Sequence, residues 1–156
     1  MVLNGERLNR CVVENFLEVM GVTKLTSDEL AMTSPVKLAY LGDAIYEIHI
    51  RSYLMNEKKG KVNDLNQMAV AYVNASAQGY AARELETFLD EKEWRILKRG
   101  RNYKSTPPKN ANVSDYKYAT GIEALLGHLY IEGKNDRIYE IMRKCIELID
   151  SRGENE

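Results

Sequence analysis

Long apolar runs, cysteine and proline are all scarce in this chain. Its apolar runs last only a few residues, whereas a membrane-spanning helix needs about 20 in succession, so a membrane span is excluded. Cys11 and Cys145 stand among apolar residues at helical spacing and support neither a disulfide framework nor a zinc cluster. The first residues lack the basic start and apolar segment of a secretory signal, so we expect a cytoplasmic protein.

The chain does have the composition of a folded domain, with 44% hydrophobic and 29% charged residues among 156. Its charges are unevenly placed. Residues 98–117 carry six basic side chains against Asp115 alone, a net charge of +5, while the remainder of the chain carries −6. One cationic segment on an acidic body is typical of a protein that contacts a polyanion at one place.

Helical periodicity, interrupted by only three prolines and without strand-like alternation, predicts an all-α bundle of about six to seven helices. We expect one domain over residues 1–156, with its core over residues 6–151 and a polar tail over 152–156. The first three predicted helices cover residues 6–20, 35–56 and 62–88, and a short helical turn follows Thr26, which with Glu29 resembles a capping box. A fourth helix is capped by Asp90 and ends in the basic segment. A fifth runs from Asn112 or Ser114 to Tyr130, and a sixth from Asn135 to Ser151. Residues 105–113 form a loop.

Two acidic residues stand at unusual places on these helices. Glu123 projects from the middle of an apolar stripe, and Asp43 lies with Glu47 on a helix that is apolar on two sides. Because a buried carboxylate costs several kcal/mol unless it is compensated, Glu123 needs a partner, which could be an Arg or Lys from another helix. Asp43 could instead cap a break at Gly42, and both Asp43 and Glu47 could form exposed ion pairs. If Asp43 and Glu123 converge, a divalent cation held by oxygen ligands, Mg²⁺ or Mn²⁺, would neutralise their repulsion.

Several motifs in order make the chain recognisable. Residues 38–47, LAYLGDAIYE, resemble the signature helix of the ribonuclease III catalytic domain, and residues 123–127, EALLG, resemble the second acidic motif of that family. The chain is more similar still to the Mini-III ribonucleases, which consist of the catalytic domain alone. Their recurring features match residues 98–102, KRGRN, then Lys104-Ser105, 108–110, PKN, and 116–123. The resemblance extends from about Pro35 to Tyr130.

This resemblance implies an all-helical homodimer that cleaves double-stranded RNA, with no DNA and no membrane as partner. It also implies that Asp43 and Glu123 are the catalytic residues and ligands of Mg²⁺, which Mn²⁺ can replace, and that the products carry 5′-phosphate and 3′-hydroxyl ends. The expected role is maturation of the ends of precursor 23S ribosomal RNA.

The basic segment supplies the candidate RNA contacts. Lysine and arginine position a duplex through its phosphates, and asparagine can contact the shallow minor groove of A-form RNA. The predicted RNA-binding residues are Arg99, Arg101, Asn102, Lys104 and Lys109. Complementing the dipole at the end of the preceding helix would explain a few of these charges but not their continuation through the proline loop. Asn63, Gln67, Asn74 and Gln78 also share an uncharged face of the predicted helix 62–88, which we interpret as solvated.

The chain also departs from the larger enzymes of the family. Ala39 and Thr120 stand where those enzymes carry two further acids, which leaves the number of metals open. A second hypothesis is therefore a non-catalytic, ribonuclease III-like assembly factor that binds ribosomal RNA. A third is a helical protein-interaction domain whose basic loop binds an acidic partner.

Overall fold

The computed structural model describes residues 16–155, which form helices and connections and contain no strand. The all-α prediction is therefore confirmed for this part of the chain. Contacts divide the chain into two compact units, one up to Met32 and one from Thr33 onward, and we describe each by itself. The interpretation of residues 1–156 as a single domain stays a prediction.

The described part of the first unit contains two short helices, α2 (Phe16–Val19) and α3 (Ser27–Met32). Gly21 follows α2 with a φ of +69°, a left-handed conformation that glycine adopts readily and that ends a helix, as predicted. The predicted capping box precedes α3: the Thr26 N–H donates to Glu29 Oε2 at 2.7 Å, and the Glu29 N–H donates to Thr26 Oγ1 at 3.2 Å. Most of the predicted helix 6–20, with Cys11, lies outside the described residues.

The second unit contains the remaining helices, and most of their boundaries follow the sequence signals. Asp90 and Asn112 each cap a helix, because their Oδ1 atoms accept hydrogen bonds from the N–H groups of Glu93 and Asp115 at 2.8 and 3.0 Å. Asn112, rather than Ser114, is thus the cap of the predicted fifth helix. The helices are α4 (Pro35–Glu57), α5 (Val62–Val73), α6 (Ala75–Glu84), α7 (Glu91–Asn102), α8 (Val113–Ile131) and α9 (Asn135–Glu154).

Two predicted segments were wrong in extent. The single helix 62–88 is two helices, because Asn74 has an extended ψ of 154° and its side-chain oxygen accepts from the Ala77 N–H at 2.8 Å. An asparagine that satisfies the first N–H groups of a new helix competes with continuation of the old one. At the other end, α9 continues through Glu154, so residues 152–154 are helical rather than a polar tail.

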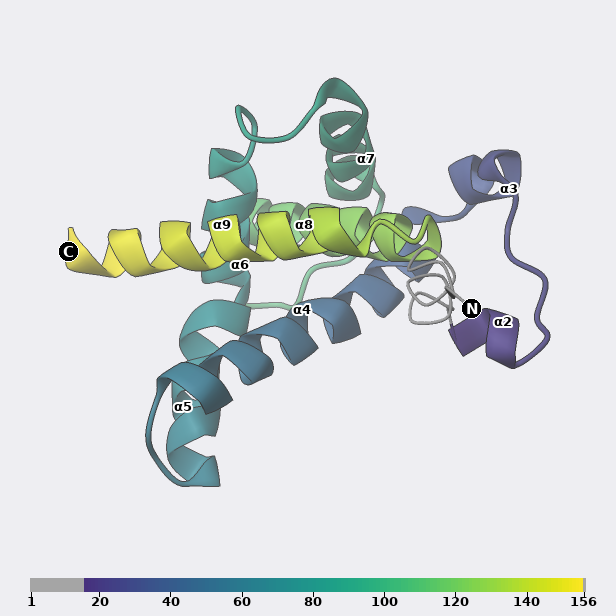
Figure 1. Ribbon diagram of the computed structural model, residues 1–156. Coiled ribbons are helices and arrows are strands. Elements are labelled where there is room, and N and C mark those ends of the chain that lie inside the picture. The colour runs from purple at the N-terminus through teal and green to yellow at the C-terminus, as the bar shows by residue number, and fades with distance from the viewer. Residues whose placement is uncertain (1–15, 156) are drawn as a thin grey trace, which may run out of the picture. The chain divides into compact units, whose positions relative to one another are not determined.

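Helix α8 lies at the centre of the second unit and packs against α4, α6, α7 and α9. In Figure 1, α8 runs behind α9, with α7 above it and α4 below it. Its residues from Ala124 to Leu129 are all buried, although they face every direction around the helix. Small residues allow this crowding: a Cβ on Gly79 of α6 would lie 2.8 Å from the Asp115 Cα, and one on Gly121 would lie 2.7 Å from the Leu97 carbonyl oxygen. No helix within residues 16–155 is long and apolar enough to cross a membrane.

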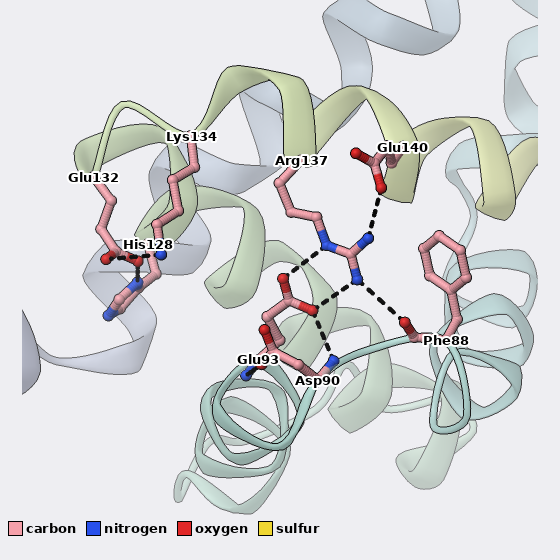
Figure 2. Close-up of polar contacts among 8 residues, drawn as sticks. All are labelled: Phe88, Asp90, Glu93, His128, Glu132, Lys134, Arg137 and Glu140. Carbon is pink, nitrogen blue, oxygen red and sulfur yellow. Dashed lines mark hydrogen bonds and ion pairs between the residues drawn. The ribbon is translucent and has the colours of Figure 1, made fainter.

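A buried ion pair joins the start of α7 to the start of α9 (Figure 2). Arg137 donates from Nε to Glu93 Oε1 at 2.7 Å and from Nη2 to Glu93 Oε2 at 2.9 Å, and it also reaches the Phe88 carbonyl oxygen at 3.1 Å. The hydrogen bonds to Glu93, with a smaller effect of Glu140, raise the pKa of Arg137 above its usual range. Because Glu93 is buried, the two-pronged contact compensates a carboxylate that would otherwise be costly.

A second polar cluster closes the C-terminal end of α8 (Figure 2). The buried His128 lies with Nδ1 2.8 Å from Glu132 Oε1, and Glu132 also pairs with Lys92 and Lys134. Burial lowers the pKa of His128 below its ordinary value. The imidazole thus lies beside a carboxylate that two lysines also contact, which gives this histidine a structural role.

Candidate active site

The two acidic motifs meet where α4 crosses α8. A Cβ on Gly42 would stand 1.7 Å from the carbonyl oxygen of Glu123, and a Cβ on Gly127 would stand 2.1 Å from the carbonyl oxygen of Leu38. Real Cβ atoms essentially never come closer than 3.0 Å to such atoms, so the helices touch backbone to backbone only because both positions are glycine. The crossing brings Asp43, the residue after Gly42, beside Glu123. Helix α4 runs unbroken through Gly42, so the alternative of a helix break there was wrong.

Asp43 and Glu123 form an asymmetric pair of carboxyl groups. Asp43 is exposed, whereas Glu123 is partly buried. Burial first, and the negative charge of Asp43 second, raise the pKa of the Glu123 carboxyl to about 8, against an opposing effect of the Gln78 side chain. Asp43 is thus open to solvent although its helix is apolar on two sides, and the two acids do converge, as the sequence allowed.

The sequence allowed ordinary ion pairs for Asp43, Glu47 and Glu123, and among the described residues only Glu47 of these three forms one. Glu47 forms the exposed ion pair that the sequence allowed, with Arg51 at 2.8 Å. Within residues 16–155, none of the ion pairs includes Glu123 or Asp43. In the described part of the chain, the groups that act on the Glu123 carboxyl are the like charge of Asp43 and the amide of Gln78, and no cationic side chain there forms an ion pair with it.

Gln78 is the residue of this site that sequence reasoning missed. Its side chain is 3% exposed, and its Nε2 donates to the Val73 carbonyl oxygen at 2.9 Å. Its Oε1 is buried without a hydrogen-bond partner. The interpretation of Gln78 as part of a solvated face was wrong because it assumed one continuous helix over residues 62–88. The break at Asn74 starts α6 anew and turns Gln78 toward α8.

The oxygen atoms gathered here fit a divalent cation such as Mg²⁺, which prefers oxygen ligands and retains several waters. They are the carboxylates of Asp43 and Glu123 and the unpartnered amide oxygen of Gln78. Residues 16–155 contain no group of three or more His, Cys, Asp or Glu side chains that could hold a metal ion by themselves. Neither departure from the family pattern supplies an acid: Ala39 is buried, and the Thr120 hydroxyl donates to the Tyr116 carbonyl oxygen at 3.1 Å.

The predicted RNA-binding residues begin on α7, the helix that packs beside this site. A Cβ on Gly100 would lie 2.9 Å from the Cβ of Ala124, the residue next to Glu123. Arg99 and Asn102 are exposed near the end of α7, and Lys104 and Lys109 are exposed in the connection from α7 to α8.

Arg101 differs from its neighbours because the fold itself engages it. Its guanidinium lies 5.1 Å from the centre of the Tyr118 ring, and its Nη1 donates to the Tyr118 hydroxyl at 2.9 Å. Arg83 of α6 packs on the same ring, 4.7 Å from its centre, and pairs with Asp115. Tyr118 therefore links α6, α7 and α8, and Arg101 contributes to the packing of these helices.

Comparison with known proteins agrees with this geometry. The family model described as the ribonuclease III domain matches residues 36–134, which include both acidic motifs. A Mini-ribonuclease 3 from Clostridium tetani is 42% identical over 135 residues, covering 85% of this chain and 89% of that protein. One from Staphylococcus aureus is 39% identical over 129 residues, covering 80% and 96%. A crystal structure of a Fusobacterium nucleatum protein, 36% identical, superposes with a TM-score of 0.67 over 74% of this chain and 93% of that one. The chain therefore belongs to the ribonuclease III family, among the compact Mini-ribonucleases 3, and is a ribonuclease.

Proposed function

We propose that this ribonuclease hydrolyses double-stranded RNA with a divalent cation, Mg²⁺ or Mn²⁺, held by Asp43 and Glu123. The observation that carries the proposal is the pair itself: Glu123 lies beside Asp43, and no Arg or Lys within residues 16–155 forms an ion pair with either acid. Two adjacent carboxylates repel each other, and burial makes the repulsion more costly. A cation bound between them would remove this cost.

The roles of the two acids differ with their burial. Glu123 sits on a helix that is enclosed on several sides, so it would fix the position of the ion. Asp43 is exposed and would hold the ion on the side that an RNA phosphate can approach. When bound, such an ion would activate a water molecule and polarise the phosphate, which yields 5′-phosphate and 3′-hydroxyl products.

For the RNA contacts, we propose that Arg99, Asn102, Lys104 and Lys109 face the duplex. All four are exposed and follow the helix that packs beside Glu123. We keep Arg101 in this set as a residue that holds the basic segment in place through Tyr118. Phosphate contacts of this kind bind the duplex without reading its sequence.

We also propose that the protein is a homodimer through the outer face of α4. Four apolar side chains on this helix are exposed, and Tyr40 is 85% exposed. The opposite face of α4 is packed in the core of the second unit, so the helix is apolar on two sides, as the sequence indicated. A contiguous exposed apolar surface marks an interaction site. The exposed apolar residues are Val36, Tyr40, Ile48 and Met55.

The proposed natural substrate is precursor 23S ribosomal RNA, and the proposed site of action is the cytoplasm, where that RNA is made in bacteria. The support for this step is the similarity to the Mini-ribonucleases 3, together with the basic segment over residues 98–117.

Incubation of the purified protein with end-labelled double-stranded RNA tests the proposal. We expect discrete products with Mg²⁺ and none with EDTA, with Asp43→Asn or with Glu123→Gln. A protein that binds duplex RNA but cuts neither a synthetic duplex nor precursor ribosomal RNA, even with Mn²⁺, would instead be an assembly factor. We retain this second function as an alternative because Ala39 and Thr120 stand where the larger enzymes carry acids.

A further inference from the structure

We propose that Gln78 is a third oxygen donor of the cation site, either as a ligand of the ion or as an acceptor for a water that the ion carries. This inference rests on the proposed metal-dependent function and goes beyond the two acids. Its starting point is the buried Oε1 atom of Gln78, which has no hydrogen-bond partner although the residue lies against Glu123.

The orientation of the Gln78 amide is fixed by its neighbours. Its nitrogen faces the Val73 carbonyl oxygen at 2.9 Å, and a carbonyl can only accept a hydrogen bond. The Gln78 side chain also lowers the pKa of the Glu123 carboxyl, so the amide lies close to that carboxyl. Turning the amide over would place two oxygens against each other at Val73, so the oxygen is left as the group without a partner.

The backbone around Gln78 holds this arrangement in place. Asn74 caps α6 four residues earlier, and the next residue, Gly79, is packed so closely that a Cβ there would lie 2.8 Å from the Asp115 Cα. Gln78 thus cannot move away from α8 without breaking this contact. A buried acceptor in a rigid setting retains its desolvation cost unless something binds to it.

A cation site in this chain also needs such a donor. Mg²⁺ completes its coordination with neutral oxygens and water as well as carboxylates. The two positions at which larger relatives carry acids are occupied by the buried Ala39 and by Thr120, whose hydroxyl donates a hydrogen bond to a backbone carbonyl. The amide oxygen of Gln78 is an uncharged donor beside Glu123, and it adds no further repulsion to the pair.

The test is Mn²⁺ affinity, measured by electron paramagnetic resonance of the free ion and by titration calorimetry, without RNA. Removing the oxygen with Gln78→Leu should weaken Mn²⁺ binding about tenfold, the lower end of what support groups of metal sites contribute. Replacing it by a carboxylate with Gln78→Glu should tighten binding severalfold at pH 8. The matched control is Gln67→Leu on α5, where the side chain is exposed, and it should leave the affinity unchanged. Thermal unfolding in EDTA shows that each variant is folded.

The outcomes separate the inference from the function on which it depends. If wild-type protein binds Mn²⁺ and both Gln78 variants bind it equally well, Gln78 serves only the Val73 carbonyl and the inference is overturned. If Gln78→Leu does not fold, Gln78→Glu decides alone, and unchanged or weaker binding overturns the inference. A wild-type protein that binds no Mn²⁺ refutes the cation site itself, and the inference with it.

Discussion

Replacing Glu123 by glutamine should stabilise the metal-free protein, and the gain should grow with pH. The pKa of this carboxyl rises from 4.5 to about 8 on folding, chiefly because burial disfavours the charged form and Asp43 adds repulsion. Above pH 4.5 the unfolded chain releases a proton that the folded chain retains, so stability is lost as pH rises toward 8. Each pKa unit corresponds to about 1.4 kcal/mol, which gives a loss of about 3 kcal/mol at pH 7.

Glu123→Gln removes this cost because an amide does not titrate. We expect the variant to be about 3 kcal/mol more stable than wild type at pH 7 and less than about 1 kcal/mol more stable at pH 5. The added NH₂ group can also donate to the unpartnered Gln78 oxygen. Asp43→Asn should give a smaller gain, because it removes the repulsion but not the burial.

Urea unfolding followed by circular dichroism, in EDTA between pH 5 and 8, measures these differences. Comparing variants at each pH cancels the titration of His128, whose lowered pKa makes every variant less stable below about pH 6.5. Adding Mg²⁺ should stabilise wild type and not Glu123→Gln, since only an ionised carboxylate binds the ion. A difference between wild type and Glu123→Gln that is the same at pH 5 and pH 8 would refute the reasoning.

Three further predictions concern packing and charge. Gly42→Ala should cost about 4 kcal/mol or prevent folding, because its Cβ would meet the Glu123 carbonyl oxygen, whereas Gly153→Ala, with nothing within 4 Å, should be neutral or slightly stabilising in thermal unfolding. Arg137→Met should cost about 3 kcal/mol by leaving a buried carboxylate unpaired; loss below 0.5 kcal/mol in urea unfolding would contradict the importance of that pair. Lys104→Gln and Lys109→Gln should each reduce the slope of duplex-RNA affinity against salt concentration by about one, as measured by filter binding, and an unchanged slope would place that lysine outside the interface.

Local signals in the sequence predicted most of the helices because those signals act within a few residues. The capping residues Asp90 and Asn112, Pro35 at the first turn of α4 and Gly21 after α2 all function as their positions indicate. The break at Asn74 was missed because alanine-rich flanks favour a helix on both sides and its cap depends on one side-chain hydrogen bond. The same error concealed Gln78, since a side chain's direction depends on the helix that carries it.

The pairing of Asp43 with Glu123 was predictable from their places among apolar residues and from the family resemblance. The difference in exposure between Asp43 and Glu123 was not predictable, because it depends on how α4 crosses α8 and not on either helix alone. The engagement of Arg101 by Tyr118 is likewise a tertiary contact between side chains 17 residues apart. Periodicity indicates which face of a helix is apolar but not which neighbour an individual charged side chain finds.

The glycine contacts at the crossing of α4 and α8 make the spacing of the acidic pair independent of the exposed basic residues that we propose contact RNA. Backbone atoms at Gly42 and Gly127 set the spacing of the acidic pair, so repacking of side chains elsewhere cannot widen it. The exposed Lys104 and Lys109 lie in the connection between α7 and α8, whereas the atoms nearest to a Cβ at the two glycines belong to Glu123 and Leu38, so we expect changes at the lysines to leave the carboxylates in place. The proposed RNA contacts can therefore be strengthened or weakened while the spacing of the two carboxylates stays constant, whereas a single methyl group at position 42 would disrupt both the fold and that spacing.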